Sequence, residues 1–312
     1  KTEYRLILTG TLITNKAIDA FSQYKFLEPR IFGKSFYAFR NRYFDMVGYG
    51  NHTPVLKKSM EPELKEKIHS IAFRATKSDC LDLPETTDIV RSVELEPNAM
   101  NIYKHLVKDS FAELSRGEVT ATNILTKILR LSQLTGGFLG DDEGKAIHQI
   151  STSKLRALED IVDEVTSSGK KLVVIARFIP EIDEITKMLE KKNLKFSIIT
   201  GSVKNRSEQI DKFQNDSDVL VFVGQIATAG LGITLTKSST MVFYSLDYSM
   251  SNFEQTKARI HRAGQCDPCT YIYLIAKGTI DEKVMKALSK KYDLASSLID
   301  DYRQGLNPFR AE

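Results

Sequence analysis

The sequence predicts an α/β fold, a parallel sheet flanked by helices, with a mainly helical portion before it. Two observations support this prediction. After residue 151, short and nearly continuous apolar strands alternate with amphipathic helices, which is the pattern of a parallel sheet buried on both faces. Before residue 140, apolar side chains follow mainly helical spacing. A chain of 312 residues also exceeds what one core needs, so we expect two structural units.

The helical portion is predicted to open with one strand. Residues Tyr4–Thr9 have the apolar pattern of a buried strand and end in the turn Thr9-Gly10-Thr11. Residues Ile89–Leu95 alternate apolar and polar side chains, and we interpret them as an extended segment crossing between the units. Helices are expected to begin at Pro62 and at Glu96-Pro97, and a third to run over Val119–Leu134 and stop at Gly136-Gly137.

The sheet portion is predicted to begin with a helix capped by Ser153 and ended by Gly169. Strands are expected at residues 171–176, 196–200, 219–223, 240–244 and 270–275. Helices are expected at residues 181–192, 207–214, 252–261 and 281–288. Since the carboxyl ends of parallel strands meet at one edge of a sheet, we expect the functional loops at that edge.

Composition narrows the class of protein. No apolar run approaches the roughly 18 residues that span a bilayer, so we expect a soluble protein with no membrane partner. Three cysteines are too few for a disulfide framework and indicate a reducing compartment, either cytoplasm or nucleus. The net charge of +4 is mild, but Lys16–Lys58 holds eight basic against three acidic residues, a local +5. The aromatic residues interleaved there either contact nucleic acid or, more commonly, form a core.

The segment Gln255–Gln265 is the most informative. It places Arg259 and Arg262 three residues apart, on one face of the predicted helix. Like charges so close require either acidic neighbours or an anionic ligand, for which phosphate is the natural candidate. Two solvated arginines on an outer face are the alternative.

This segment resembles the last helicase motif of the Swi/Snf family of DNA-dependent ATPases, roughly Gln-Ala-x-Asp-Arg-x-His-Arg-x-Gly-Gln. Other segments resemble further motifs of the same family in the expected order, so the resemblance covers nearly the whole chain. They are Leu8–Asn15 at the end of the first lobe, Phe73–Pro84 in the inter-lobe linker, Leu172–Phe178 in the first strand of the second lobe, Thr200-Gly201-Ser202 with Arg206 at the DNA, and Ala229–Ile233 beneath the nucleotide. Within the family, the segment Ala276–Glu282 after the last predicted strand resembles the compact bacterial and phage-borne members and the annealing-helicase branch.

The resemblance implies a RecA-like fold and three regions. Residues 1–15 would end the first RecA-like lobe, and residues 16–150 would form the helical Swi/Snf-specific insertion and the inter-lobe linker. Residues 151–312 would form the second RecA-like lobe, the helicase C-terminal domain. The chain opens on Lys1 rather than Met, and we expect it to be part of a longer protein.

The resemblance also implies roles for particular residues. Arg259 and Arg262 would be catalytic arginine fingers, with Arg262 the stronger candidate. The residues expected at the nucleotide are Gly230, Gly232 and Gln255, although a tight turn also explains the glycines. The residues expected at DNA phosphates are Gly201, Ser202, Lys204 and Arg206, with an ordinary helix N-cap as the alternative for the first two. The residues expected to couple the lobes are Thr9, Gly10 and Thr11.

Departures and absences qualify the resemblance. Ala258 replaces the family's acidic residue before Arg259, whose carboxylate is expected to orient that arginine. The sequence has neither a phosphate-cradling P-loop nor the Asp-Glu pair for Mg²⁺. We therefore expect ATP and Mg²⁺ to be held mainly by the missing first lobe, and this chain alone not to hydrolyse ATP. No metal is expected here, because Cys266 and Cys269 lack a second ligand pair.

The leading hypothesis is the second lobe of an ATP-dependent double-stranded DNA translocase. Its expected partners are duplex DNA and the first lobe of the same polypeptide. A bacterial or phage-encoded protein would act in the cytoplasm, and a eukaryotic one in the nucleus. One alternative is a catalytically inactive nucleic-acid-binding or regulatory module. The other is an RNA helicase lobe, which the Arg-x-His-Arg string disfavours.

Overall fold

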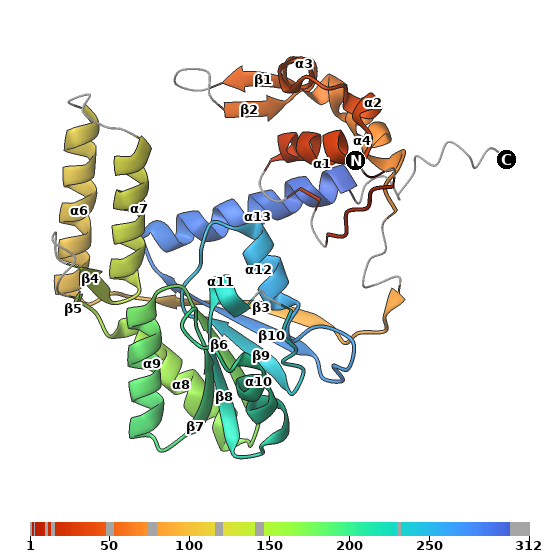
Figure 1. Cartoon of the computed structure of the whole chain (residues 1–312). Coiled ribbons are helices and arrows are strands. Elements are labelled where there is room, and N and C mark those ends of the chain that lie inside the picture. The colour runs from red at the N-terminus through yellow and green to blue at the C-terminus, as the bar shows by residue number, and fades with distance from the viewer. Residues whose placement is uncertain are drawn as a thin grey trace. The chain divides into compact units, whose positions relative to one another are not determined.

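The computed structural model describes residues 2, 4–9, 12–13, 16–47, 53–73, 80–115, 121–140, 147–229 and 232–299 (Figure 1). Their contacts divide into two compact units. The first comprises Lys1–Cys80, Ser249–Ser251 and Ala287–Glu312, and the second comprises Leu81–Tyr248 and Asn252–Lys286. Among the described residues, no helix is long and apolar enough to cross a membrane.

The first unit is built around aromatic side chains. Phe32 packs edge-on against Tyr24 and Phe39, with ring centroids 5.1 and 4.9 Å apart, and Phe21 and Tyr43 complete the cluster. Most of the interleaved aromatics are therefore core, although Tyr37 stays exposed beside Arg40. The elements of this unit are η1 (Ala17–Asp19), α1 (Ala20–Leu27), α2 (Pro29–Phe32), α3 (Phe36–Tyr43), β1 (Phe44–Val47), β2 (Thr53–Leu56), η3 (Lys58–Met60) and α4 (Glu61–His69), which begins beside Pro62 as predicted.

The predicted strand at Tyr4–Thr9 is wrong. These residues form no regular structure, and Tyr4 and Leu8 are each 87% exposed. A strand is stable only when a neighbour pairs with its backbone groups. None of the sheets in the described part of the chain includes this segment.

The second unit holds the predicted parallel sheet. Its strand order is β3-β10-β9-β6-β8-β7, with every neighbouring pair parallel. The strands predicted from residue 171 onward agree with the observed bounds within two residues at each end. The strands are β3 (Thr86–Val93), β6 (Lys171–Ala176), β7 (Lys195–Ile199), β8 (Val219–Gln225), β9 (Ser238–Phe243) and β10 (Cys269–Ala276).

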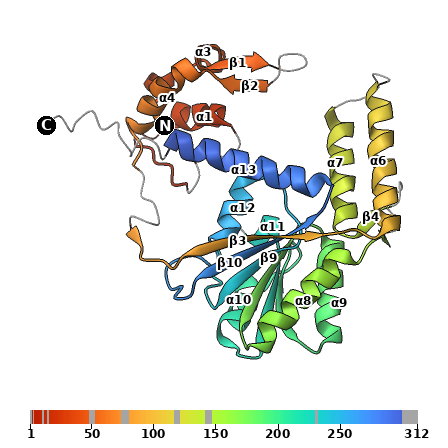
Figure 2. The same ribbon diagram turned by 180° about the vertical axis from the view of Figure 1, so that it is seen from behind.

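The segment expected to be extended, Ile89–Leu95, overlaps β3 and lies at one edge of this sheet. Its register against β10 runs from Thr86 opposite Cys269 to Val93 opposite Ala276. Figure 2 shows β3 beside β10. Residues 86–93 therefore belong structurally to the sheet that the later strands form.

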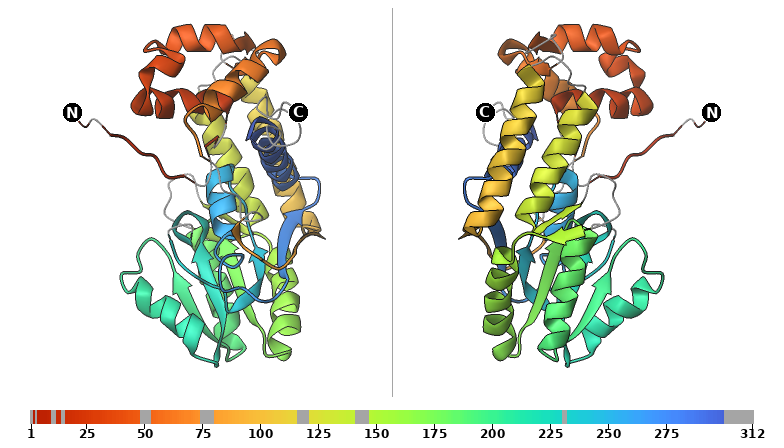
Figure 3. Two further views of the ribbon diagram at one scale, coloured as in Figure 1. Left: turned by 90° about the vertical axis from the view of Figure 1, so that its right-hand side faces the viewer. Right: turned by 90° about the vertical axis from the view of Figure 1, so that its left-hand side faces the viewer.

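Helices cover both faces of the sheet, because alternate side chains of each buried strand point to opposite faces. Leu158 of α8 and Ile185 of α9 share one core with Val174 of β6. Phe213 of α10 and Phe253 of α12 pack on Phe222 and Phe243, on the other face. Figure 3 shows helices on either side of the strands. The helices are α8 (Ser153–Ser167), α9 (Ile179–Lys191), α10 (Arg206–Asn215), α11 (Ile226–Ala229), α12 (Met250–Lys257) and α13 (Ile280–Ile299).

Two further helices and a small hairpin precede α8. The helices are α6 (Pro97–Ser115) and α7 (Ala121–Thr135), and the hairpin pairs β4 (Phe138–Gly140) with β5 (Ile147–Gln149). The stop predicted at Gly136-Gly137 is confirmed. Gly137 has a φ of +104°, and a Cβ there would lie 2.5 Å from the Ser151 carbonyl oxygen, so only glycine fits. The compact units divide near residue 81, and the family-based boundaries at residues 15 and 150 stay predictions.

Candidate functional site

The carboxyl edge of the sheet brings together three strand ends through one side chain, Gln225. Its Oε1 accepts a hydrogen bond from the Gly201 backbone N–H at 3.3 Å, beyond the end of β7. Its Nε2 donates to the Arg177 carbonyl at 3.3 Å, beyond the end of β6. The Gly201 N–H predicted to face DNA is therefore engaged by Gln225 in this structure.

The predicted DNA-contact residues lie in one short connection between β7 and α10. Lys204 is exposed, and Arg206 is the first residue of α10, with its Nε donating to the Val203 carbonyl at 3.3 Å. The Ser202 hydroxyl lies 3.0 Å from the Thr200 hydroxyl. Because Asn205 is the N-cap of α10, the alternative that Gly201-Ser202 caps this helix is wrong.

The two predicted arginine fingers leave the helix but still converge. The helix predicted over residues 252–261 ends at Lys257, so Arg259 and Arg262 lie in the loop that follows, residues 258–265, called the arginine loop below. The expectation that they share a helical face is thus wrong. Nevertheless, the NH1 groups of Arg259 and Arg262 both donate to the Ile233 carbonyl, at 3.4 and 3.2 Å.

The convergence has an electrostatic consequence. Burial, and then the adjacent charge of Arg262, lowers the pKa of the Arg259 guanidinium. Two cations held together at a carbonyl oxygen favour an anion, because an anion would form charge-assisted hydrogen bonds with both. The arrangement is therefore chemically suited to bind a phosphate group.

The glycine segment predicted at the nucleotide lies beside these arginines. Gly232 directly precedes Ile233, whose carbonyl the two arginines share. Its φ of +66° is a backbone conformation that glycine adopts readily and that residues with a side chain rarely adopt. Gln255 has an exposed side chain, and its backbone carbonyl accepts from Arg259 Nε at 2.8 Å. Gly230 lies outside the described residues, as do Gly10 and Thr11, and Thr9 is exposed.

Gln265 holds the arginine loop in place. It is 6% exposed, and its Nε2 lies within 3.2 Å of three carbonyl oxygens, those of Thr236, Ser238 and Ile260. Its Oε1 accepts from the Cys266 and Asp267 backbone N–H groups, both at 3.0 Å. Residues 266–268 are thus a bend organised by a glutamine. In the described ranges, no group of three or more His, Cys, Asp or Glu side chains is arranged to hold a metal ion.

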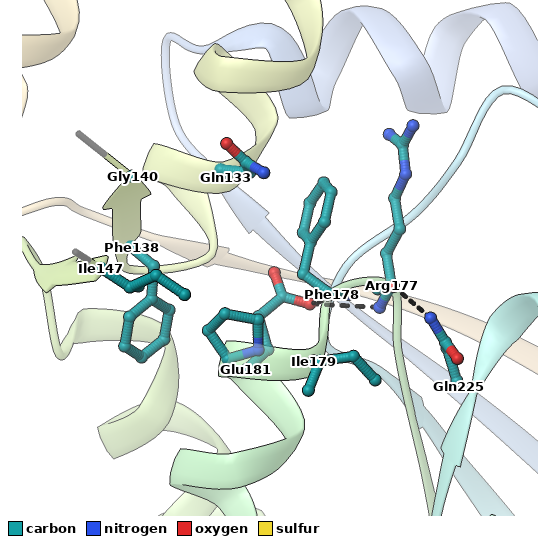
Figure 4. Close-up of a pocket in the computed structure, with 10 residues that line it drawn as sticks. Gln133, Phe138, Gly140, Ile147, Arg177, Phe178, Ile179, Glu181 and Gln225 are labelled. Carbon is teal, nitrogen blue, oxygen red and sulfur yellow. Dashed lines mark hydrogen bonds between the residues drawn. The ribbon is translucent and has the colours of Figure 1, made fainter. Parts of the chain in front are cut away.

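A cavity of about 310 Å³ lies where β6 and β8 end (Figure 4). Glu181 lines it and is 1% exposed, and its Oε2 accepts from the Ser245 hydroxyl at 2.6 Å and from the Arg177 and Phe178 backbone N–H groups at 3.1 Å. Burial raises the pKa of the Glu181 carboxyl. The remaining lining residues are Gln133, Phe138, Gly140, Ile147, Arg177, Phe178, Ile179, Pro180 and Gln225.

Arg177, Glu181 and Gln225 were not identified from the sequence. Each lies at the carboxyl edge of the sheet, near the ends of β6 and β8. A polar residue at the end of a buried strand was the available signal, since Arg177 directly follows β6 and Gln225 is the last residue of β8. Glu181 carried the weaker signal of an acidic residue in the first turn of α9, where it completes a capping arrangement.

Comparisons with known proteins identify two family models along the chain. An SNF2-related domain matches residues 1–137, and a helicase conserved C-terminal domain matches residues 153–264. An uncharacterized ATP-dependent helicase of Mycoplasma pneumoniae is 28% identical over 96% of this chain and 28% of its own length. A RAD54-like DNA repair and recombination protein of Drosophila persimilis is 25% identical over 96% of this chain and 43% of its own length. The chain therefore spans less than half of these curated relatives.

Solved structures agree with the fold. The Sulfolobus solfataricus SWI2/SNF2 ATPase core in complex with dsDNA aligns with a TM-score of 0.56 and 25% identity, covering 92% of this chain and 60% of that one. The core domain from the same organism gives 0.56 and 24%, covering 92% of this chain and 58% of that one. The parallel sheet flanked by helices is thus the arrangement shared with these ATPase cores.

Proposed function

Because the chain belongs to the Swi/Snf family of helicase-related ATPases, we propose that it forms the carboxy-terminal part of an ATP-driven motor that moves along double-stranded DNA. The convergence of Arg259 and Arg262 on one carbonyl beside Gly232 carries this proposal. In this proposal residues 1–15 end the first lobe, residues 16–150 are the insertion and linker, and residues 151–312 are the second lobe.

The two arginines act as fingers on ATP. Their N–H groups now donate to the neutral oxygen of Ile233, and a γ-phosphate would accept stronger, charge-assisted hydrogen bonds in its place. Positive charge at that point stabilises the negative charge that develops on the transferred phosphoryl group. ATP and Mg²⁺ are bound mainly by the first lobe, and Gly232 and Gln255 approach the nucleotide from this one.

The connection between β7 and α10 contacts the DNA backbone. Lys204 and Arg206 supply charge, while Gly201 and Ser202 supply a backbone N–H and a hydroxyl. A phosphate oxygen that takes the Gly201 N–H must displace Gln225 Oε1, a neutral acceptor at 3.3 Å. Duplex DNA in the similar Sulfolobus solfataricus complex supports this assignment of the partner. Thr9, Gly10 and Thr11 couple the two lobes in the same proposal.

The proposal is tested on the parent polypeptide, the longer protein that contains both lobes. Its ATP turnover is measured with and without duplex DNA. We expect DNA to stimulate turnover, and Arg262→Ala to lower the stimulated rate by on the order of 10³-fold or more, as for other arginine fingers. The matched control is Arg156→Ala, which removes an arginine on α8 that is paired with Glu96. This chain by itself is expected to show no turnover.

If DNA does not stimulate ATP turnover but the parent polypeptide still binds duplex DNA, the motor hypothesis fails and the hypothesis of a nucleic-acid-binding module takes its place. Equal losses in Arg262→Ala and Arg156→Ala would show that the effect is not specific to the arginine loop. Tighter binding to single-stranded RNA than to duplex DNA would favour an RNA helicase lobe.

A further inference from the structure

Asp88 of β3 contacts two side chains, Lys257 at the end of α12 and Tyr273 within β10. Its Oδ1 lies 2.7 Å from the Lys257 ammonium and also accepts a short hydrogen bond from the Tyr273 hydroxyl. Burial, helped by this hydrogen bond, raises the pKa of the Tyr273 phenol, so the phenol stays a donor. Asp88 therefore holds one cation and one hydroxyl from two different elements.

Lys257 is fixed by more than this ion pair. Its ammonium lies 4.3 Å from the centre of the Tyr271 ring, and its backbone carbonyl accepts from the Tyr271 hydroxyl at 3.0 Å. The Lys257 side chain is 18% exposed, so water screens its charge less than at an open surface. Both ends of this residue are thus tied to the sheet.

Lys257 is also the point where the arginine loop begins. It is the last residue of α12, and Arg259 follows two residues later. The loop itself is contacted by a residue that precedes β3. His261 Nε2 lies 2.9 Å from the carbonyl oxygen of Pro84. The register of β3 on β10 places Asp88 opposite Tyr271, and Pro84 lies two residues before this strand begins.

Ala258 is the first residue of the arginine loop and has no charged side chain. Ala258 occupies the place that carries an acidic residue in the related helicase motif, and Asp88 reaches the residue just before it from a strand 169 positions earlier. A carboxylate that fixes Lys257 limits the movement of the loop that follows.

We propose that Asp88 is a positioning residue for Arg259 and Arg262, acting through Lys257, so that docking of β3 on β10 sets the position of the arginine loop. This inference rests on the proposed function of the two arginines. Asp88 does not touch the nucleotide in this proposal. Its loss should therefore impair the chemical step more than substrate binding.

The test uses the parent polypeptide and three variants. Asp88→Asn keeps the shape and removes the charge, and Arg262→Ala reports on the proposed function. Asp160→Asn is the matched control, because Asp160 pairs with Arg91 on the same strand at 3.2 Å but lies on α8. We expect Asp88→Asn to lower the DNA-stimulated kcat by on the order of 10-fold to 100-fold, the cost of misplacing a reacting group. The KM for ATP, the Kd for DNA and the activity of Asp160→Asn should stay within about twofold of wild type if the role is positional.

A double-mutant cycle separates positioning from a general loss of stability. Lys257→Gln should impair kcat as Asp88→Asn does, and the double variant should be no worse than either single one, because both changes break the same contact. In this chain by itself, amide hydrogen exchange over residues 258–265 should speed up in Asp88→Asn and stay unchanged in Asp160→Asn.

The outcomes distinguish the two proposals. Wild-type kcat in Asp88→Asn, together with a lost rate in Arg262→Ala, overturns the positioning role and leaves the motor intact. Full activity in Arg262→Ala overturns the arginine-finger proposal and the role of Asp88 with it. Unchanged exchange in the arginine loop of Asp88→Asn also counts against positioning.

Discussion

Gln225 shows how a single neutral side chain organises the edge where DNA is proposed to bind. Its amide accepts from the Gly201 N–H and donates to the Arg177 carbonyl, so it joins the ends of β6, β7 and β8. A neutral oxygen is a weaker acceptor than a phosphate oxygen. Gln225 can therefore hold the Gly201 N–H in place without preventing a phosphate from taking it.

Gln225→Glu should weaken binding of duplex DNA. A carboxylate in place of the amide puts a negative charge beside the Gly201 N–H, and repulsion of a phosphate about 4 Å away costs about 1 kcal/mol in water, or roughly fivefold in Kd. Fluorescence anisotropy with a labelled duplex measures the change. The loss should shrink as salt is raised.

Two variants control this measurement. Gln225→Leu removes the amide without adding charge and should bind DNA no more weakly than Gln225→Glu. Gln214→Glu adds the same charge near the Lys237 backbone N–H, just before β9 and hence at the opposite edge of the sheet, and should leave affinity unchanged. Equal affinity of Gln225→Glu and wild type at low salt would argue against a phosphate at Gly201.

At the scale of elements, a buried ion pair joins three helices of the second unit. Lys154 of α8 lies 2.6 Å from Asp281 of α13, and the two side chains are 1% and 12% exposed. Asp281 also accepts from the Thr135 hydroxyl at the end of α7, at 2.8 Å, and from the Ala276 backbone N–H at 3.1 Å. The charges are buried together, so each one needs the other.

Lys154→Met should destabilise the second unit by about 3 kcal/mol, because it leaves a buried carboxylate without its cation. Denaturant unfolding of this chain, followed by far-UV circular dichroism, measures the change. The control is Lys195→Met, which breaks the exposed pair of Lys195 and Asp218 and should cost less than about 1 kcal/mol. Adding Asp281→Asn to Lys154→Met should recover part of the loss; equal effects of the two lysine variants would contradict the assigned role of burial.

For the whole molecule, the local distribution of charge says more about a DNA partner than the net charge does. The net charge of +4 is small for a chain of 312 residues and predicts little about partners. The proposed DNA contacts are instead concentrated in the connection between β7 and α10, where Lys204 and Arg206 lie. Binding that depends on such contacts releases counterions and responds steeply to salt.

Lys204→Ala should make duplex binding less sensitive to salt. Each phosphate neutralised contributes about −0.9 to the slope of log K against log salt concentration, so the slope should become shallower by about 0.9. The control is Lys195→Ala, at the amino end of β7, whose ammonium is paired with Asp218 at 2.7 Å and should not alter the slope. An unchanged slope in Lys204→Ala would remove this lysine from the proposed DNA contacts.

The parallel sheet and most of its helices could be predicted from the order of the residues. Strands such as β6, with five successive buried residues from Leu172 to Ala176, are buried on both faces and therefore carry unbroken apolar runs. The end of the helix at Gly136-Gly137 could also be predicted from a short stretch of sequence, because it depends on the backbone conformation that glycine allows. The arginine string was recognisable for the same reason, since its members are close in sequence.

The contacts between residues far apart in the sequence became visible with the folded chain. The pairing of β3 with β10, the contact of Asp88 with Lys257 and the sharing of the Ile233 carbonyl by two arginines all join separate segments. Periodicity records which face of an element is apolar, but it does not record which neighbour will cover that face. For this reason Tyr4–Thr9 had the pattern of a strand without forming one, whereas residues 86–93 became a strand because β10 offered an edge with unpaired backbone groups.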